Sequence, residues 1–99
     1  MRLVRVPLTR AQFDALVSFV FNVGVGNFQR STLLRRVNGR QFHAVPNELM
    51  KWTNIRVDGN PVQLRGLVLR RAAEARLFNA RVFDQPVVLL QTLGAAPNT

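Results

Sequence analysis

The sequence contains no cysteine, which excludes disulfides, thiol nucleophiles and cysteine-ligated metals. Such a chain suits a reducing compartment or a bacterial source. It also has a single histidine, His43. Because no second ligand or nucleophile signature accompanies it, His43 is interpreted as a half-exposed helix residue. The sequence therefore predicts no metal site and no cofactor.

Long apolar runs are also lacking, and the longest falls far short of the ~20 residues that cross a bilayer. Arg2 and Arg5 stand near the N-terminus, but no long apolar segment follows them. We therefore expect neither a transmembrane segment nor a signal peptide.

Acidic residues are scarce as well: fourteen basic residues against five acidic ones give a net charge of +9. An excess this large attracts polyanions. Arginine suits phosphate groups, but no recognition helix or stacking platform is legible, so nucleic acid is an unfavoured partner. The alternative is that the arginines reflect a GC-rich genome and only keep the chain soluble. Both interpretations of the charge stay open.

The chain is long enough for one domain, since 99 residues with 47% apolar composition can build one core. We expect this domain to cover residues 1–83. Residues 84–99, which include Pro86, Gly94 and Pro97, are expected to form a poorly ordered tail.

The stretch from Leu8 to Gly39 carries the clearest helix signals. Thr9 and Gln12 have the spacing of a capping box, and Gly24 is a good terminator, so a helix is predicted over 10–23. Its inward face is predicted from apolar residues recurring at helical spacing, namely Phe13, Leu16, Val17, Val20 and Phe21. Such a helix belongs in the middle of a core.

Shorter helices are expected after it. Ser31 can cap a helix that ends at Val37. A third helix is expected over 42–53, although Pro46 puts its start in doubt because proline is tolerated only in the first turn. Residues 54–60 are expected to form a loop.

The last long helix is predicted to open at Asn60 and Pro61, an N-cap and N1 pair, and to end near 78–81. The residues predicted to face inward are Leu64, Leu67, Val68, Ala72, Ala75 and Phe78. Those predicted to face solvent are Arg70, Arg71, Glu74 and Arg76. The fold class is therefore all-α, with four to five helices.

Four blocks of the sequence carry a resemblance: LTRAQFDALVSFVFNVGVGNF, STLLRRVNG, ELMKW and GLVLRRAAEARLF. In this order and spacing they resemble the second, C-terminal lobe of phage-type lysozymes, the endolysins related to the phage T4 enzyme. The resemblance covers residues 7–78. It implies a muramidase, which hydrolyses the β-1,4 bond between N-acetylmuramic acid and N-acetylglucosamine in peptidoglycan for host cell lysis.

In that family the catalytic glutamate lies on a helix of a separate first lobe, and a glycine-rich hairpin adds an aspartate and a threonine. Neither pattern occurs in this sequence, so we expect the catalytic N-terminal lobe to be absent and the chain alone to show little or no turnover. A glycosidase needs an acid that is protonated at neutral pH and a second carboxylate. None of the five carboxylates is expected to be catalytic: Asp14, Glu48, Asp58, Glu74 and Asp84.

Three of these carboxylates have specific ordinary explanations. Glu74 follows Arg70 and Arg71 on one helix, which favours its ionised form. Asp58 suits a turn, and Glu48 is interpreted as a solvated residue on a helix face.

The resemblance implies a substrate-binding role for Phe21, Asn22 and Trp52, which would border the cleft between the lobes. Asn22 would offer its amide to sugar N-acetyl or peptide groups, braced by the indole N–H of Trp52. The alternative is that Asn22 ends the first helix and Trp52 fills the core. The two interpretations are not exclusive.

The expected partner is peptidoglycan or another anionic cell-envelope polymer, and a separate first lobe is a further expected partner. The alternative function is a non-catalytic basic module that binds cell wall or lipopolysaccharide, or disturbs membranes. By the resemblance, the chain would be made in the bacterial cytoplasm from a phage or prophage and act on the wall after release.

Overall fold

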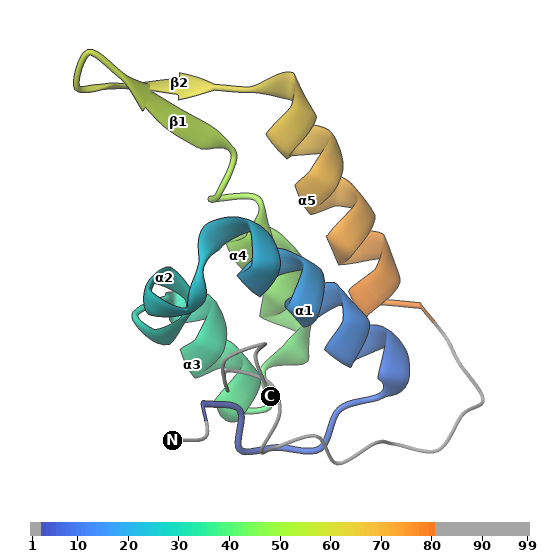
Figure 1. The fold of residues 1–99 in the computed structure, drawn as a ribbon. Coiled ribbons are helices and arrows are strands. Elements are labelled where there is room, and N and C mark those ends of the chain that lie inside the picture. Colours follow the sequence, from blue (N-terminus) through green and yellow to red (C-terminus); the bar gives the residue numbers. More distant parts are fainter. Residues whose placement is uncertain (1–2, 81–99) are drawn as a thin grey trace.

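A computed structural model describes residues 3–80 of the chain, so Asp84 and the predicted tail lie outside the described residues. In order, the elements are α1 (Arg10–Val23), α2 (Val25–Gln29), α3 (Thr32–Asn38), a 3₁₀ turn η1 (Phe42–Ala44), α4 (Val45–Leu49), β1 (Asn54–Val57), β2 (Asn60–Gln63) and α5 (Arg65–Phe78). Helix α5 packs along α1 and against α4, α2 contacts α1, and α3 contacts both α2 and α4. The hairpin projects from the helical part (Figure 1). The mostly helical fold is as predicted.

Helix α1 begins and ends where the sequence predicts. The Thr9 hydroxyl accepts a hydrogen bond from the Gln12 backbone N–H at 3.0 Å, and the Gln12 side chain accepts one from the Thr9 N–H at 2.9 Å. The helix stops at Gly24, whose φ of 93° is a conformation that favours glycine.

The buried face of α1 differs from the predicted one. Its buried residues are Ala11, Ala15, Leu16 and Phe19, whereas Phe21 is 79% exposed and Val17 is 38% exposed. The prediction that Val17 and Phe21 point into the core is therefore wrong. Residues of α1 are apolar on most sides of the helix, so their spacing alone does not indicate which side is buried. The neighbours decide it, because α5 and the core aromatics meet the side that carries Phe19.

The core centres on Phe19 and Phe28, whose rings meet edge to face with centroids 6.2 Å apart. The segment before α1 adds to this core through the buried side chains of Leu3, Val4, Val6 and Leu8. Asn38 ties the segment to α3, since its Nδ2 donates to the Leu3 carbonyl at 2.8 Å and its Oδ1 accepts from the Arg5 N–H at 2.7 Å.

Helix α3 follows its prediction. Ser31 caps it by accepting a hydrogen bond from the Leu34 N–H at 3.1 Å. The predicted third helix over 42–53 is shorter in the structure, where η1 leads into α4 and the helix ends at Leu49. Pro46 lies in the first turn of α4. Its missing N–H costs nothing there, so it sets the start of the helix.

The prediction of a loop over 54–60 and a helix start at Asn60 and Pro61 is wrong. Strands β1 and β2 pair antiparallel, with Ile55 opposite Val62. The turn residues Asp58 and Gly59 have φ values of 51° and 82°, the positive values that a tight hairpin turn needs. Pro61 is tolerated because β2 is an edge strand.

Helix α5 is also turned relative to its prediction. Phe78 is buried as predicted, but so are Arg71 and Glu74, which were predicted to face solvent. Leu64, predicted inward, is 37% exposed and precedes the helix as its N-cap. Within residues 3–80, no helix has both the length and the apolar character that a bilayer span requires.

Candidate functional site

A pocket of about 340 Å³ lies where the end of α1, the base of the hairpin and the start of α5 meet. Its lining residues carry no charge: Asn22, Val23, Asn27, Trp52, Asn54, Ile55 and Leu67. The structure thus brings together two of the three predicted substrate-binding residues, Asn22 and Trp52. Phe21 does not line the pocket. It lies on the same helix as Asn22, and its ring is exposed.

Trp52 is half-buried and belongs to two environments. Its ring packs edge to face against Phe19, with centroids 5.5 Å apart and planes at 83°. It also forms part of the pocket wall. One side of Trp52 therefore joins the core and another lines the pocket.

Asn22 is held by α5. Its Oδ1 accepts a hydrogen bond from Nη2 of Arg71 at 2.8 Å. The partner of Asn22 is thus Arg71, and the predicted bond from the Trp52 indole is not the one formed. Among residues 3–80, the Nδ2 atom of Asn22 has no hydrogen-bond partner. Its two N–H donors remain available at the pocket.

Arg71 is fully buried beneath the pocket. Its Nε lies 2.8 Å from Oε1 of Glu74, and its guanidinium lies over the Phe19 ring, 4.9 Å from the centroid. Glu74 also accepts a hydrogen bond from the Ser18 hydroxyl at 2.6 Å and lies 3.5 Å from Nε of Arg70. Burial lowers the pKa of Arg71, and the Glu74 carboxylate partly offsets this.

Sequence reasoning missed the role of Arg71 and Glu74. Their spacing of three residues on a helix does favour an ion pair. It does not indicate which way the pair faces, and an arginine–glutamate pair on a helix is usually solvated. The decisive contact joins Arg71 to Asn22, 49 residues away, which local spacing cannot reveal.

None of the carboxylates in residues 3–80 lines the pocket. Asp14 lies 3.5 Å from Arg10 on the exposed start of α1. Glu48 is buried and lies 3.1 Å from Nζ of Lys51, so its interpretation as a solvated residue is wrong. Asp58 lies in a turn, as predicted, and this turn joins the two strands of the hairpin. His43 is exposed, and within residues 3–80 no cluster of acidic or histidine side chains could hold a metal.

Comparison with known proteins places this fold. The family model described as Phage lysozyme matches residues 1–74, which is most of the chain. The chain belongs to the phage lysozyme family. A curated relative, the endolysin of Acyrthosiphon pisum secondary endosymbiont phage 1, is 43% identical over 77 residues, which are 78% of this chain and 53% of that endolysin.

Two solved structures agree with this membership. The muramidase domain of SpmX from Asticaccaulis excentricus is 43% identical with a TM-score of 0.77, over 80% of this chain and 54% of that one. An endolysin from Escherichia coli O157:H7 phage FAHEc1 is 32% identical with a TM-score of 0.77, over 84% of this chain and 52% of that one. This member of the family thus spans about half the length of these relatives.

Proposed function

We propose that this chain is the sugar-binding lobe of a muramidase and that its pocket receives part of a peptidoglycan strand. The observation that carries the proposal is the pocket wall shared by Asn22 and Trp52 in a member of the phage lysozyme family. An amide and an indole are a suitable pair for an N-acetylated sugar, because one hydrogen-bonds and the other packs. Phe21 precedes Asn22 in the sequence and has a ring that is 79% exposed, so it is the third residue proposed to contact the sugar.

The first test follows the emission of Trp52, the only tryptophan in a chain without tyrosine. Titration with soluble peptidoglycan fragments should give a saturable shift, because a sugar in the pocket displaces water from the indole. Binding should be weak, since only one lobe of the proposed enzyme contacts and orders the ligand. Asn22→Ala should abolish the shift without changing the circular dichroism spectrum. If the Trp52 emission of the wild-type chain does not change at millimolar ligand, the proposed function is contradicted.

The same proposal predicts that the chain alone does not cleave the glycosidic bond. Glycoside hydrolysis needs a pair of carboxyl groups flanking the bond, and the pocket lining contains none. In the proposed enzyme the acid comes from the part that corresponds to the remaining half of the relatives. Purified chain added to bacterial sacculi should release no reducing sugar above the blank. Release that disappears in Glu48→Gln would show that this chain supplies an acid after all.

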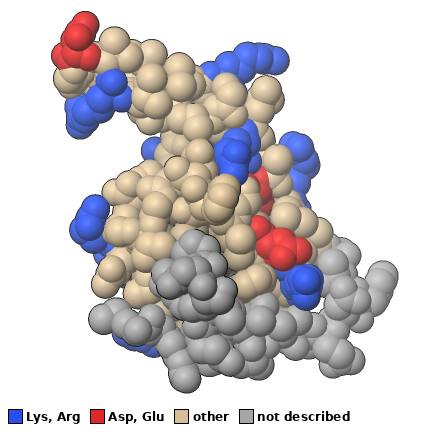
Figure 2. Space-filling view, viewed as in Figure 1, with Lys and Arg blue, Asp and Glu red and all other residues tan. Residues whose placement is uncertain are grey.

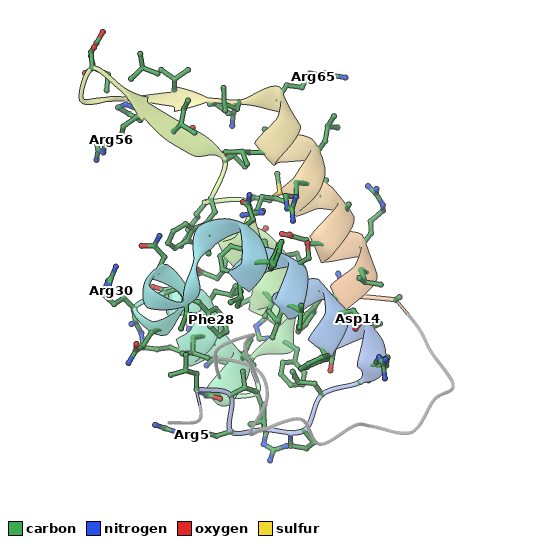
Figure 3. All side chains as sticks on the ribbon, in the orientation of Figure 1. Arg5, Asp14, Phe28, Arg30, Arg56 and Arg65 are labelled. Carbon is green, nitrogen blue, oxygen red and sulfur yellow. The ribbon has the colours of Figure 1, made fainter. Side chains whose placement is uncertain are left out.

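A second candidate function, binding to anionic wall polymers by charge, is favoured by one observation. Residues 15–47 contain no acidic side chain, yet they carry Arg30, Arg35, Arg36 and Arg40. We call these four residues the arginine segment. Three of them are exposed, and Figure 3 shows Arg30 pointing outward on the same side of the helical part as Arg5. Basic residues also lie at other places around the molecule (Figure 2).

Salt distinguishes the two functions. Exposed charges are screened over about 10 Å at 0.1 M salt and more strongly above it. If the arginine segment binds the wall, co-sedimentation with sacculi should be lost at about 0.5 M salt. Arg35→Gln with Arg40→Gln should weaken it more than the matched pair Arg56→Gln with Arg65→Gln, which removes the same charge elsewhere. Binding that persists at this salt concentration and is unchanged in both double variants would favour the pocket.

A further inference from the structure

We propose that Asn38 is a site of spontaneous covalent modification, deamidation to aspartate or isoaspartate, and that the packing of residues 3–8 against α3 controls how fast it reacts. The modification is independent of the proposed sugar-binding function, because Asn38 does not line the pocket. It acts instead on the segment that Asn38 ties to the helical core.

The chemistry follows from the residue after Asn38. Asn38 precedes Gly39, and this is the single Asn–Gly pair in the sequence. In the reaction, solvent base removes the proton of the Gly39 backbone nitrogen, which attacks Cγ of Asn38. A bond forms between this nitrogen and Cγ, the bond from Cγ to Nδ2 breaks, and the amide leaves as ammonia. Water then opens the cyclic imide at either carbonyl, which gives aspartate or isoaspartate. Glycine favours the attack because it has no side chain to hinder the approach.

The folded chain keeps the two reacting groups apart. Asn38 is the last residue of α3, and a helical side chain tilts toward the N-terminus of its helix, away from the next backbone nitrogen. The Gly39 N–H also donates a hydrogen bond to the Arg35 carbonyl at 2.9 Å, so this proton is already engaged. The reaction therefore requires the Asn38 side chain and the end of α3 to move first.

The side-chain amide of Asn38 is fixed by the segment before α1 (Figure 1). Its Nδ2 donates to the Leu3 carbonyl at 2.8 Å, and its Oδ1 accepts from the Arg5 N–H at 2.7 Å. The segment is in turn anchored by the buried side chains of Leu3, Val4, Val6 and Leu8. Asn38 can turn toward Gly39 only when this segment leaves α3. Such a movement is a local opening, which costs less free energy than unfolding of the whole chain.

The product cannot restore the contact. Aspartate at position 38 places an acceptor oxygen opposite the Leu3 carbonyl oxygen, where Nδ2 donates in the unmodified chain. The carbonyl loses its donor, and a negative charge lies beside it. Isoaspartate also lengthens the backbone by a methylene group at the end of α3. Modification therefore releases the segment that slowed it, and the release is irreversible.

The first experiment measures deamidation of the whole chain in mildly alkaline buffer, with and without urea. Digestion under acidic conditions and mass spectrometry locate each modified asparagine. In urea, Asn38 should be modified before Asn79, because Ala80 carries a methyl group that Gly39 lacks. In the folded chain, Asn38 should react at least about tenfold more slowly than in urea. Equal rates with and without urea would overturn the inference.

Val4→Ala separates local opening from unfolding of the whole chain. Val4 belongs to the segment and is 1% exposed. Val45→Ala is the matched control, because Val45 is fully buried in α4 and the substitution removes the same atoms. Where melting curves show both variants folded, Val4→Ala should modify Asn38 at least about threefold faster than Val45→Ala. Equal rates would show that the segment does not control the reaction. Val6→Ala takes the place of Val4→Ala if that variant does not fold.

Asn38→Asp tests the consequence of the modification. It should raise hydrogen exchange within residues 3–8 about tenfold, because the Leu3 carbonyl loses its donor. Asn79→Asp brings the same charge to the end of another helix and should leave this exchange as in wild type. If exchange in residues 3–8 is the same in Asn38→Asp as in wild type, the proposed release of the segment is wrong.

Discussion

Phe19→Ala should lower the free energy of unfolding by about 3–5 kcal/mol, because removing a buried aromatic ring leaves a cavity. The Phe19 ring contacts Phe28, Trp52 and the guanidinium of Arg71, so no single neighbour can move in to fill the space. Urea unfolding followed by far-ultraviolet circular dichroism measures the loss. A domain of this size has a stability near the low end of about 5–15 kcal/mol, so much of the variant should be unfolded at 37 °C.

Phe21→Ala is the matched control, two residues further along the same helix. Its ring is 79% exposed, so its removal should change the free energy of unfolding by no more than about 0.5 kcal/mol. Phe19→Leu gives an intermediate point if Phe19→Ala is too unstable to measure. Equal losses for Phe19→Ala and Phe21→Ala would mean that α1 packs through another face.

Replacing Arg71 alone should be almost as costly. Arg71→Met leaves the Glu74 carboxylate buried with Arg70 as its remaining charged partner. The Arg70 side chain is 41% exposed, and its Nε lies 3.5 Å from Oε2 of Glu74. Breaking a buried ion pair typically costs about 3–5 kcal/mol, and the remaining arginine places the expected loss near 3 kcal/mol. Thermal and urea unfolding at neutral pH measure it.

The double variant Arg71→Met with Glu74→Met should recover most of that loss, since neither charge then remains buried without a partner. Arg10→Met is the control at the surface. The Arg10–Asp14 pair is 65% and 50% exposed, so breaking it should cost at most about 1 kcal/mol. A double variant as unstable as Arg71→Met would show that packing around the guanidinium, rather than charge pairing, holds α5 to α1.

The parts of the fold that sequence predicted are those set by neighbours along the chain. Each of these signals acts within four residues. Thr9 and Gln12 set the start of α1, Gly24 sets its end, and Ser31 sets the start of α3. The hairpin was missed because Asn60 and Pro61 also fit a helix start, although Asp58 and Gly59 are a strong hairpin signal. Only pairing across the turn distinguishes the two.

The candidate site divides in the same way. Asn22 and Trp52 were predicted through resemblance, and the structure places both at one pocket. Arg71 is predicted to face solvent, and arginines are indeed seldom buried. Its burial depends on three groups brought from other positions: the Phe19 ring, the Ser18 hydroxyl that holds Glu74, and the Asn22 oxygen. No pattern within α5 encodes them.

The exposed hairpin gives the pocket two walls of unequal stability. All eight residues of β1 and β2 are exposed, and two strands alone are marginally stable in water. The base is closed at Thr53, whose carbonyl accepts from the Leu64 N–H at 2.9 Å and whose hydroxyl accepts from Gln63 at 3.2 Å. Local unfolding therefore costs least here. If the pocket receives a peptidoglycan strand as proposed, the wall that carries Asn54 and Ile55 is therefore expected to move before α1, which carries Asn22.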